Sequence, residues 1–104
     1  MPEKALFLPL KSTYFAAFAA GEKQVEYRKA GGRWNANTCA VGRPVVLSNG
    51  YGKGQRLEGT ISAYEERLPA ELGPEYEDWA VACDMAAGQK IACIHIHNIK
   101  PMVD

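Results

Sequence analysis

The sequence is poor in the residues that build covalent or metal-bound frameworks. It has only three cysteines and two histidines among 104 residues, and an odd cysteine count without a C-x-x-C pair argues against a disulfide framework. No apolar run approaches the roughly 20 residues that a membrane-spanning helix needs. The first residues also lack the basic and long apolar segments of a signal peptide. We therefore expect a soluble cytoplasmic protein with reduced thiols and no membrane partner.

The chain has no low-complexity tract and no excess of charge of either sign. Its composition is that of an ordinary globular protein, and its length suits one domain with one core over residues 1–104. The zero net charge hides an uneven distribution, because residues 23–56 carry seven basic and one acidic side chain, whereas residues 57–104 carry three basic and nine acidic ones. The basic segment would attract a ligand with phosphate groups if its charges converge, and the alternative is that they scatter around the fold.

Local patterns in the first half of the chain predict strands around one short helix. Leucines alternate with other residues over positions 6–10, which is typical of a strand that enters the core. A short apolar helix follows over residues 14–20, where the hydroxyl of Ser12 or Thr13 would cap its first turn and Gly21 would end it. Further strands are predicted over residues 23–28, 44–49 and 56–64, the last two as a hairpin.

The last third of the chain carries a different pattern. Apolar residues spaced three and four apart predict one amphipathic helix over residues 69–87, with Pro74 near its start and Gly88 at its end. A final strand is predicted over residues 90–99. The order of strand, helix, three strands, helix and strand indicates an α+β fold, which we expect to be a small mixed β-barrel of about five to six strands with two or three short helices.

The most specific motif lies where the predicted helix turns into the second strand. The segment 21–28 fits the pattern G-x-K-x-x-E-x-R, whose fixed positions are Gly21, Lys23, Glu26 and Arg28. In its helix–turn–strand setting, this motif resembles the signature of the ASCH family within the PUA-like superfamily, whose members handle RNA. The match covers residues 5–65. Two further features of the family are Arg33-Trp34 in a loop and Val41-Gly42-Arg43 before a strand. Asn49-Gly50-Tyr51 resembles the hairpin tip of its bacterial and phage-borne members.

The resemblance implies a PUA-like barrel that binds RNA or a modified nucleotide, and nothing in the sequence indicates a cofactor. Lys23 lies at the mouth of the predicted strand, with Val25 and Tyr27 on the same side, while Glu26 and Arg28 share the other side. We expect Lys23, Glu26 and Arg28 to converge in one cleft with an aromatic ring from a neighbouring loop, Trp34 or Tyr51. The predicted ligand-binding residues are Lys23, Glu26, Arg28, Arg33, Trp34, Tyr51 and Lys53.

This cluster suits the recognition of a polar base edge. A carboxylate flanked by two cations stays ionised, so Glu26 can accept hydrogen bonds from an exocyclic amine, while Arg28 donates to carbonyl or phosphate oxygens. On an exposed barrel face, loss of the Glu26 charge should cost on the order of 1 kcal/mol or less, so we expect Glu26→Gln to weaken ligand binding more than folding. One alternative is that the three residues form only a salt-bridge ladder on the barrel face. Another alternative is an interaction domain of phage origin without nucleotide chemistry.

The resemblance also implies enzymatic alternatives. Some short ASCH proteins are amidohydrolases that remove an acyl group from the exocyclic nitrogen of modified cytidine with a lysine, a threonine and a glutamate. Here Lys23 matches the lysine, Glu26 replaces the threonine, and Glu71 and Glu75 are both candidates for the glutamate. A catalytic role would therefore fall to Lys23 and Glu26, without the hydroxyl nucleophile. Other members are reported as ribonucleases, a role for which the sequence assigns no residue.

Two other features are not expected to form sites. Cys93, His95 and His97 share one face of the last predicted strand, but neighbours on one strand rarely converge on a metal ion without a ligand from elsewhere. We interpret them as barrel-wall residues and expect no metal. The glycine-rich segment 50–54 is not followed by Gly-Lys-Ser/Thr or by a helix, so it is not predicted to be a phosphate-binding P-loop.

Overall fold

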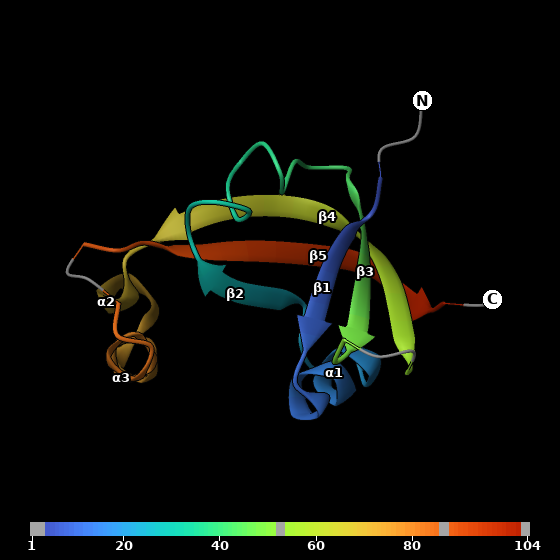
Figure 1. The fold of residues 1–104 in the computed structure, drawn as a ribbon, viewed down its shortest axis with the longest axis horizontal. Coiled ribbons are helices and arrows are strands. Elements are labelled where there is room, and N and C mark those ends of the chain that lie inside the picture. The colour runs from blue at the N-terminus through green and yellow to red at the C-terminus, as the bar shows by residue number, and fades with distance from the viewer. Residues whose placement is uncertain (1–3, 52–53, 86–87, 103–104) are drawn as a thin grey trace.

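The computed structural model of the chain describes residues 4–51, 54–85 and 88–102, and these form one five-stranded sheet with three short helices (Figure 1). None of the helices is long or apolar enough to cross a membrane. In chain order, the strands are β1 (Leu6–Leu10), β2 (Val25–Lys29), β3 (Pro44–Asn49), β4 (Arg56–Arg67) and β5 (Ile91–Pro101). The helices are α1 (Ser12–Ala19), α2 (Pro69–Leu72) and α3 (Pro74–Ala82).

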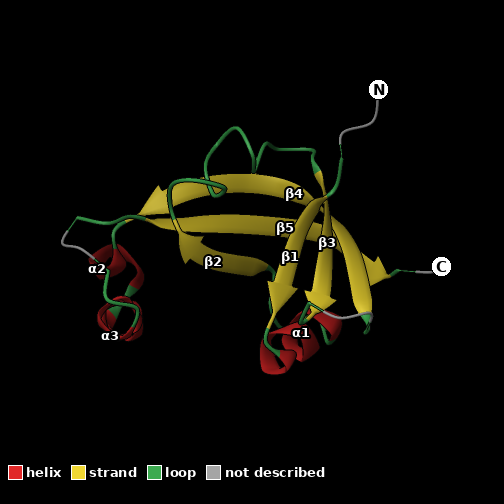
Figure 2. Cartoon of the chain, in the orientation of Figure 1, coloured by secondary structure: helices red, strands yellow, loops and turns green. Residues whose placement is uncertain are grey.

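The strands follow the order β1-β3-β4-β5-β2 across the sheet, so β1 and β2 are its two edges. β1 runs parallel to β3, and all other neighbours are antiparallel, including the predicted hairpin of β3 and β4. The sheet curls into a half-barrel and leaves a seam between β1 and β2 (Figure 2). The α+β class and the small mixed sheet agree with the sequence prediction. The barrel is not closed, however, because no backbone ladder joins the two edge strands within the described part of the chain.

The long strands β4 and β5 bend together, and a glycine lies at the bend. Their pairing shifts register between Glu58 and Thr60, and such irregularities increase the local twist and curvature of a sheet. Gly59 lies at this shift, where an added Cβ would come within 2.8 Å of the Ile96 side chain and 3.1 Å of the His97 carbonyl oxygen. A residue without a side chain therefore lets β5 approach β4 closely at this point.

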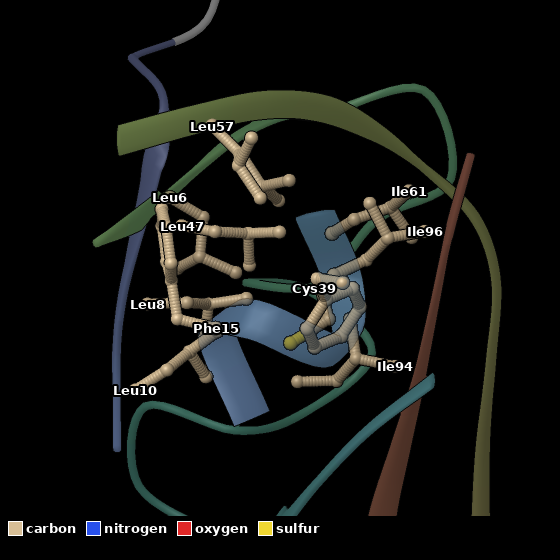
Figure 3. Packing of buried hydrophobic residues seen from close by; sticks show 12 residues of the cluster. Leu6, Leu8, Leu10, Phe15, Cys39, Leu47, Leu57, Ile61, Ile94 and Ile96 are labelled. Carbon is tan, nitrogen blue, oxygen red and sulfur yellow. The ribbon is translucent and has the colours of Figure 1, made fainter. Parts of the chain in front are cut away.

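The core lies inside the half-barrel, and α1 lies across one end of it (Figures 1 and 3). Phe15 and Phe18 of α1 are buried in this core, and their spacing of three places them on one face of the helix. Trp34, Tyr64 and Ile99 are partly buried against it. The buried cluster consists of Leu6, Leu8, Leu10, Phe15, Phe18, Cys39, Val45, Leu47, Leu57, Ile61, Ile94 and Ile96.

The two ends of α1 compare differently with the sequence prediction. The helix begins at Ser12, and its N-cap is Lys11, which makes no side-chain hydrogen bond. The prediction that Ser12 or Thr13 caps the helix is therefore wrong, because both residues lie inside the first turn. The predicted stop is confirmed, since Gly21 follows the helix with a φ of 78°, a conformation that glycine adopts without a steric penalty.

The single helix predicted over residues 69–87 is wrong in extent. It is divided into α2 and α3 at Gly73, whose φ of 123° interrupts the helical backbone, and Pro74 disfavours the helical conformation at the residue before it. Pro74 does begin a helix, as predicted, but α3 ends at Ala82. Residues 86 and 87 of the predicted helix lie outside the described residues.

Replacing Gly59 with alanine should destabilise the protein by about 1–3 kcal/mol, because the added methyl group overpacks the contact between β4 and β5. Gly54→Ala is the matched control, since its Cβ would meet only the Asn49 carbonyl oxygen at 3.6 Å, an ordinary contact. Urea denaturation would measure both free energies of unfolding. Equal effects of the two substitutions would show that Gly59 does not permit the close approach.

Candidate functional site

The end of α1 places Lys23 ahead of β2 and not within it. The amides of Gly21 and Glu22 donate to the carbonyl oxygens of Phe18 at 3.1 Å and Ala17 at 2.9 Å, which is the Schellman arrangement of a helix end. The amide of Lys23 also donates to the Ala17 carbonyl at 3.2 Å. β2 begins only after this turn, so the predicted strand start at Lys23 is wrong. The alternation of side chains along a strand does not govern where the Lys23 side chain points.

Glu26 is a carboxylate buried between two cations on the inner face of the half-barrel. The residue is only 6% exposed, and it lies opposite the core residue Ile94 in the sheet. Its Oε2 lies 2.9 Å from Nε of Arg28 and 2.8 Å from Nη2, and its Oε1 lies 3.7 Å from Nζ of Lys23. The three charged side chains of the motif thus converge. Glu26 does not lie on an exposed barrel face, so the premise of the low cost predicted for losing its charge does not hold.

Arg28 also connects the two edges of the sheet. Its Nη2 donates to the Pro9 carbonyl oxygen of β1 at 2.6 Å. The Leu10 carbonyl oxygen accepts from the amide of Gly50, directly after β3, and carbonyl directions alternate along a strand, so the Pro9 carbonyl points into the seam. Proline suits this position, because its missing N–H falls on an edge that has no ladder partner.

Lys23 is enclosed by aromatic rings in addition to its contact with Glu26. Its Nζ lies between 5.0 and 5.5 Å from the ring centroids of Tyr14, Phe18 and Tyr27, and such contacts favour a cation. Burial nevertheless lowers the pKa of Lys23, and the Glu26 carboxylate opposes this shift. The Lys23 side chain is 20% exposed, so its ammonium group stays within reach of a ligand.

Lys23 and Glu26 line a cleft of about 310 Å³ between the sheet and α3. This volume lies at the lower end of the range for small-molecule sites, roughly 300–1,000 Å³. Tyr27 of β2 and Tyr76 of α3 meet here with ring centroids 5.0 Å apart. We call this site the tyrosine cleft, and its lining residues are Tyr14, Lys23, Glu26, Tyr27, Glu75 and Tyr76.

The structure distinguishes the two glutamates that the sequence left open. Glu75 lines the tyrosine cleft. Glu71 is engaged at the start of α2, where its Oε1 accepts a hydrogen bond from the Leu68 amide at 2.8 Å and its Oε2 lies 3.7 Å from Nη1 of Arg67. Of the two residues, Glu75 is therefore the one placed to act together with Lys23.

Among the described residues, Arg28, Arg33, Trp34 and Tyr51 do not line the tyrosine cleft. The Trp34 ring packs against the core and lies 5.0 Å from the guanidinium carbon of Arg28 and 4.8 Å from that of Arg33, so it contacts the charged cluster through Arg28. Tyr51 is 83% exposed and lies against Phe7, with ring centroids 6.4 Å apart. Lys53 lies outside the described residues. The rings of the cleft instead come from Tyr14, Tyr27 and Tyr76.

The cysteine and histidine side chains of β5 have other surroundings. No group of three His, Cys, Asp or Glu side chains among the described residues is arranged to hold a metal ion. Cys93 is buried, and burial raises the pKa of its thiol. His95 Nε2 lies 3.1 Å from Glu65 Oε2, and the other carboxylate oxygen of Glu65 pairs with Arg67 at 2.7 Å. This pairing accounts for His95 without a ligand.

Replacing Glu26 with glutamine should destabilise the protein by about 3 kcal/mol, since Arg28 and Lys23 would be left partly buried without a counter-charge. Glu58→Gln is the matched control, because Glu58 pairs at 3.5 Å with the exposed Lys100 and such surface pairs contribute about 1 kcal/mol or less. Denaturant unfolding at neutral pH would compare the two variants. A loss for Glu26→Gln as small as that of the control would contradict a structural role for the buried carboxylate.

Lys23 should titrate below the ordinary lysine pKa of 10.5, because burial disfavours its charged form. Glu26→Gln should lower the pKa of Lys23 further, since the carboxylate is the group that raises it. Between the folded-state pKa and 10.5 the unfolded chain binds more protons at this site, so Lys23 makes stability increase with pH in that interval. NMR titration of methyl-labelled lysines would measure both values. A pKa at or above 10.5, or an increase in the variant, would refute this environment for Lys23.

No protein-family model, no curated protein and no solved structure matches this chain. The likeness to the ASCH family therefore rests on sequence features alone, namely the motif at residues 21–28 in its helix–turn–strand setting and the further matches within residues 5–65. The tyrosine cleft brings one ammonium group and two carboxylates together with three tyrosine rings.

Proposed function

We propose that the tyrosine cleft binds the base of a modified nucleotide, free or as part of RNA. The observation that carries this proposal is the convergence of Lys23, two carboxylates and tyrosine rings on a cleft of about 310 Å³. Mostly apolar walls with a few fixed polar groups are typical of small-molecule sites. A nucleobase suits such walls, because its flat faces stack on aromatic rings while its edge carries hydrogen-bond donors and acceptors.

The polar groups of the cleft suit a base edge that carries an amine next to an acceptor atom. The ammonium group of Lys23 only donates hydrogen bonds, whereas an ionised Glu75 only accepts them. Both oxygens of Glu26 already face cations, so Glu75 is the better acceptor for a base amine, and Glu26 serves to position Lys23. Cytosine offers a matching edge, since its exocyclic amine donates to a carboxylate and its neighbouring acceptor atoms can bind the ammonium group.

The tyrosine rings supply the faces on which such a base would stack. Tyr27 and Tyr76 come from different elements and are tilted by 56° to each other, so a planar ligand can contact one face without displacing the other ring. Burial raises the pKa of Tyr27, and the neighbouring Tyr76 adds to this shift. The Tyr27 hydroxyl therefore stays protonated at neutral pH and can donate to a ligand. Stacking of this kind contributes about 1–3 kcal/mol per base.

A second candidate function is hydrolysis of an acyl group from the amine of the same base, and the presence of Glu75 and Lys23 in one cleft favours it. Glu75 would take a proton from water as the water oxygen adds to the acyl carbon, and Lys23 would stabilise the oxyanion. Glu75 then returns the proton to the leaving amine as the C–N bond breaks, which yields a carboxylic acid and the free amine. This route needs no hydroxyl group at position 26.

Calorimetric titration with cytidine and N4-acetylcytidine tests the proposal, and chromatography of the mixtures detects hydrolysis. Glu75→Gln should weaken cytidine binding by about tenfold or more, because a charge-assisted hydrogen bond to the base amine is lost. Glu71→Gln is the matched control, since Glu71 is engaged with Leu68 and Arg67, and it should leave the affinity unchanged.

The outcomes of this experiment separate the two candidate functions. A parent protein that binds no nucleoside would remove the proposed role of the tyrosine cleft. Cleavage of N4-acetylcytidine by the parent and by Glu71→Gln, with none by Glu75→Gln, would select hydrolysis over binding alone. Equal effects of the two substitutions would show that Glu75 has no special role.

A further inference from the structure

A second cluster of arginines and aromatic rings lies at the β1 edge of the sheet. The guanidinium carbon of Arg56 lies 5.6 Å from the ring centroid of Phe7, and the Phe7 ring lies 6.4 Å from that of Tyr51. Nη2 of Arg33 donates to the Phe7 carbonyl oxygen at 3.3 Å. We call Phe7, Arg33, Tyr51 and Arg56 the edge surface. β1, which carries Phe7, is the blue strand beside the seam in Figure 1.

Ion pairing and burial do not account for the charged groups and the tyrosine ring of the edge surface. Arg33 and Arg56 are exposed, and within the part of the chain that the structure describes neither is paired with a carboxylate. Tyr51 is 83% exposed beside the turn after β3, so its ring buries little area. Cations without counter-charges beside an exposed ring are typical of surfaces that bind an anionic ligand with flat faces.

Stacked side chains connect the edge surface with the tyrosine cleft. The Trp34 ring contacts the guanidinium groups of Arg33 at 4.8 Å and Arg28 at 5.0 Å. Arg28 pairs with Glu26, which lines the cleft, and Arg33 bonds to the backbone of Phe7. A row of side chains, namely Glu26, Arg28, Trp34 and Arg33, therefore links the wall of the cleft to the backbone of the β1 edge.

We propose that a single-stranded nucleic acid follows this row, with phosphate groups at Arg33 and Arg56 and a base stacked on Tyr51. A single strand repeats the two features that the edge surface can bind, namely phosphates and unpaired base faces. An acidic peptide offers charge without regularly spaced flat rings, and a duplex keeps its bases paired. The inference rests on the proposed function for the nucleotide in the tyrosine cleft and extends it, because that nucleotide would belong to a strand.

Fluorescence anisotropy with a labelled single-stranded RNA of about ten nucleotides tests the strand path, since sites of this kind cover roughly 4–16 nucleotides. Tyr51→Ala should weaken RNA binding about tenfold through lost stacking. Arg56→Ala should weaken it and reduce the slope of log K against log salt concentration by about 0.7, the value for one phosphate contact on a single strand. Arg67→Ala is the matched control for charge, because Arg67 is a surface arginine paired with Glu65 and Glu71.

The results distinguish the edge surface from the tyrosine cleft. The strand path is overturned if the RNA binds no more tightly than cytidine, or if Arg67→Ala weakens RNA binding as much as the edge variants do. Neither result affects the role of the cleft, provided that the parent protein binds cytidine. If an unlabelled duplex displaces the labelled RNA as well as an unlabelled single strand does, the proposal that an unpaired base stacks on Tyr51 is overturned. Weakened RNA binding in the edge variants, together with a parent that does not bind cytidine, supports the strand path and removes the proposed role of the cleft. Melting temperatures equal to that of the parent verify that the variants are folded.

Discussion

The half-barrel depends on how the protein joins two sheet edges that no backbone ladder connects. Arg28 spans the seam, because its guanidinium group binds Glu26 on β2 and the Pro9 carbonyl on β1 at the same time. A partly buried guanidinium needs a counter-charge to offset its lost hydration, and Glu26 supplies it. Arg33, in the loop after β2, donates to the Phe7 carbonyl oxygen of β1, so two arginine side chains bond to the β1 edge that has no ladder partner.

The same carboxylate that holds the seam also organises the tyrosine cleft. Glu26 faces Lys23 with its second oxygen and thereby holds an ammonium group among aromatic rings, where burial alone would disfavour the charge. A threonine at position 26, as in the amidohydrolases that the motif resembles, could supply neither the counter-charge for Arg28 nor that for Lys23. Glu26 thus belongs both to the contacts that hold the fold and to the proposed ligand site, whereas Glu75 lines the cleft without pairing across the seam.

The sequence predicted most of the strands and the first helix, but it missed several local details of turns and helix ends and the contacts between distant elements. The alternating leucines of β1 and the stop at Gly21 depend on neighbouring residues, and both predictions are confirmed. Strand alternation predicted that Lys23 and Glu26 lie on opposite faces. The two side chains pair instead, because Lys23 lies in the turn after α1, before β2 begins. Tyr76 and Glu75 carry no local signal, since their helical spacing only indicates an amphipathic helix. They reach the cleft because α3 contacts β2 through Tyr76 and Tyr27.

The distribution of charge in space gives the proposed path a direction. The acidic residues of the last third include Glu71, Glu75 and Glu77 on α2 and α3, and Figure 1 places these helices and β1 at opposite sides of the molecule along its long axis. A polyanion is attracted to the edge surface and repelled by the acidic helices. A nucleic acid strand would therefore approach from β1, and the tyrosine cleft, walled on one side by α3, would receive a base near the end of the bound strand.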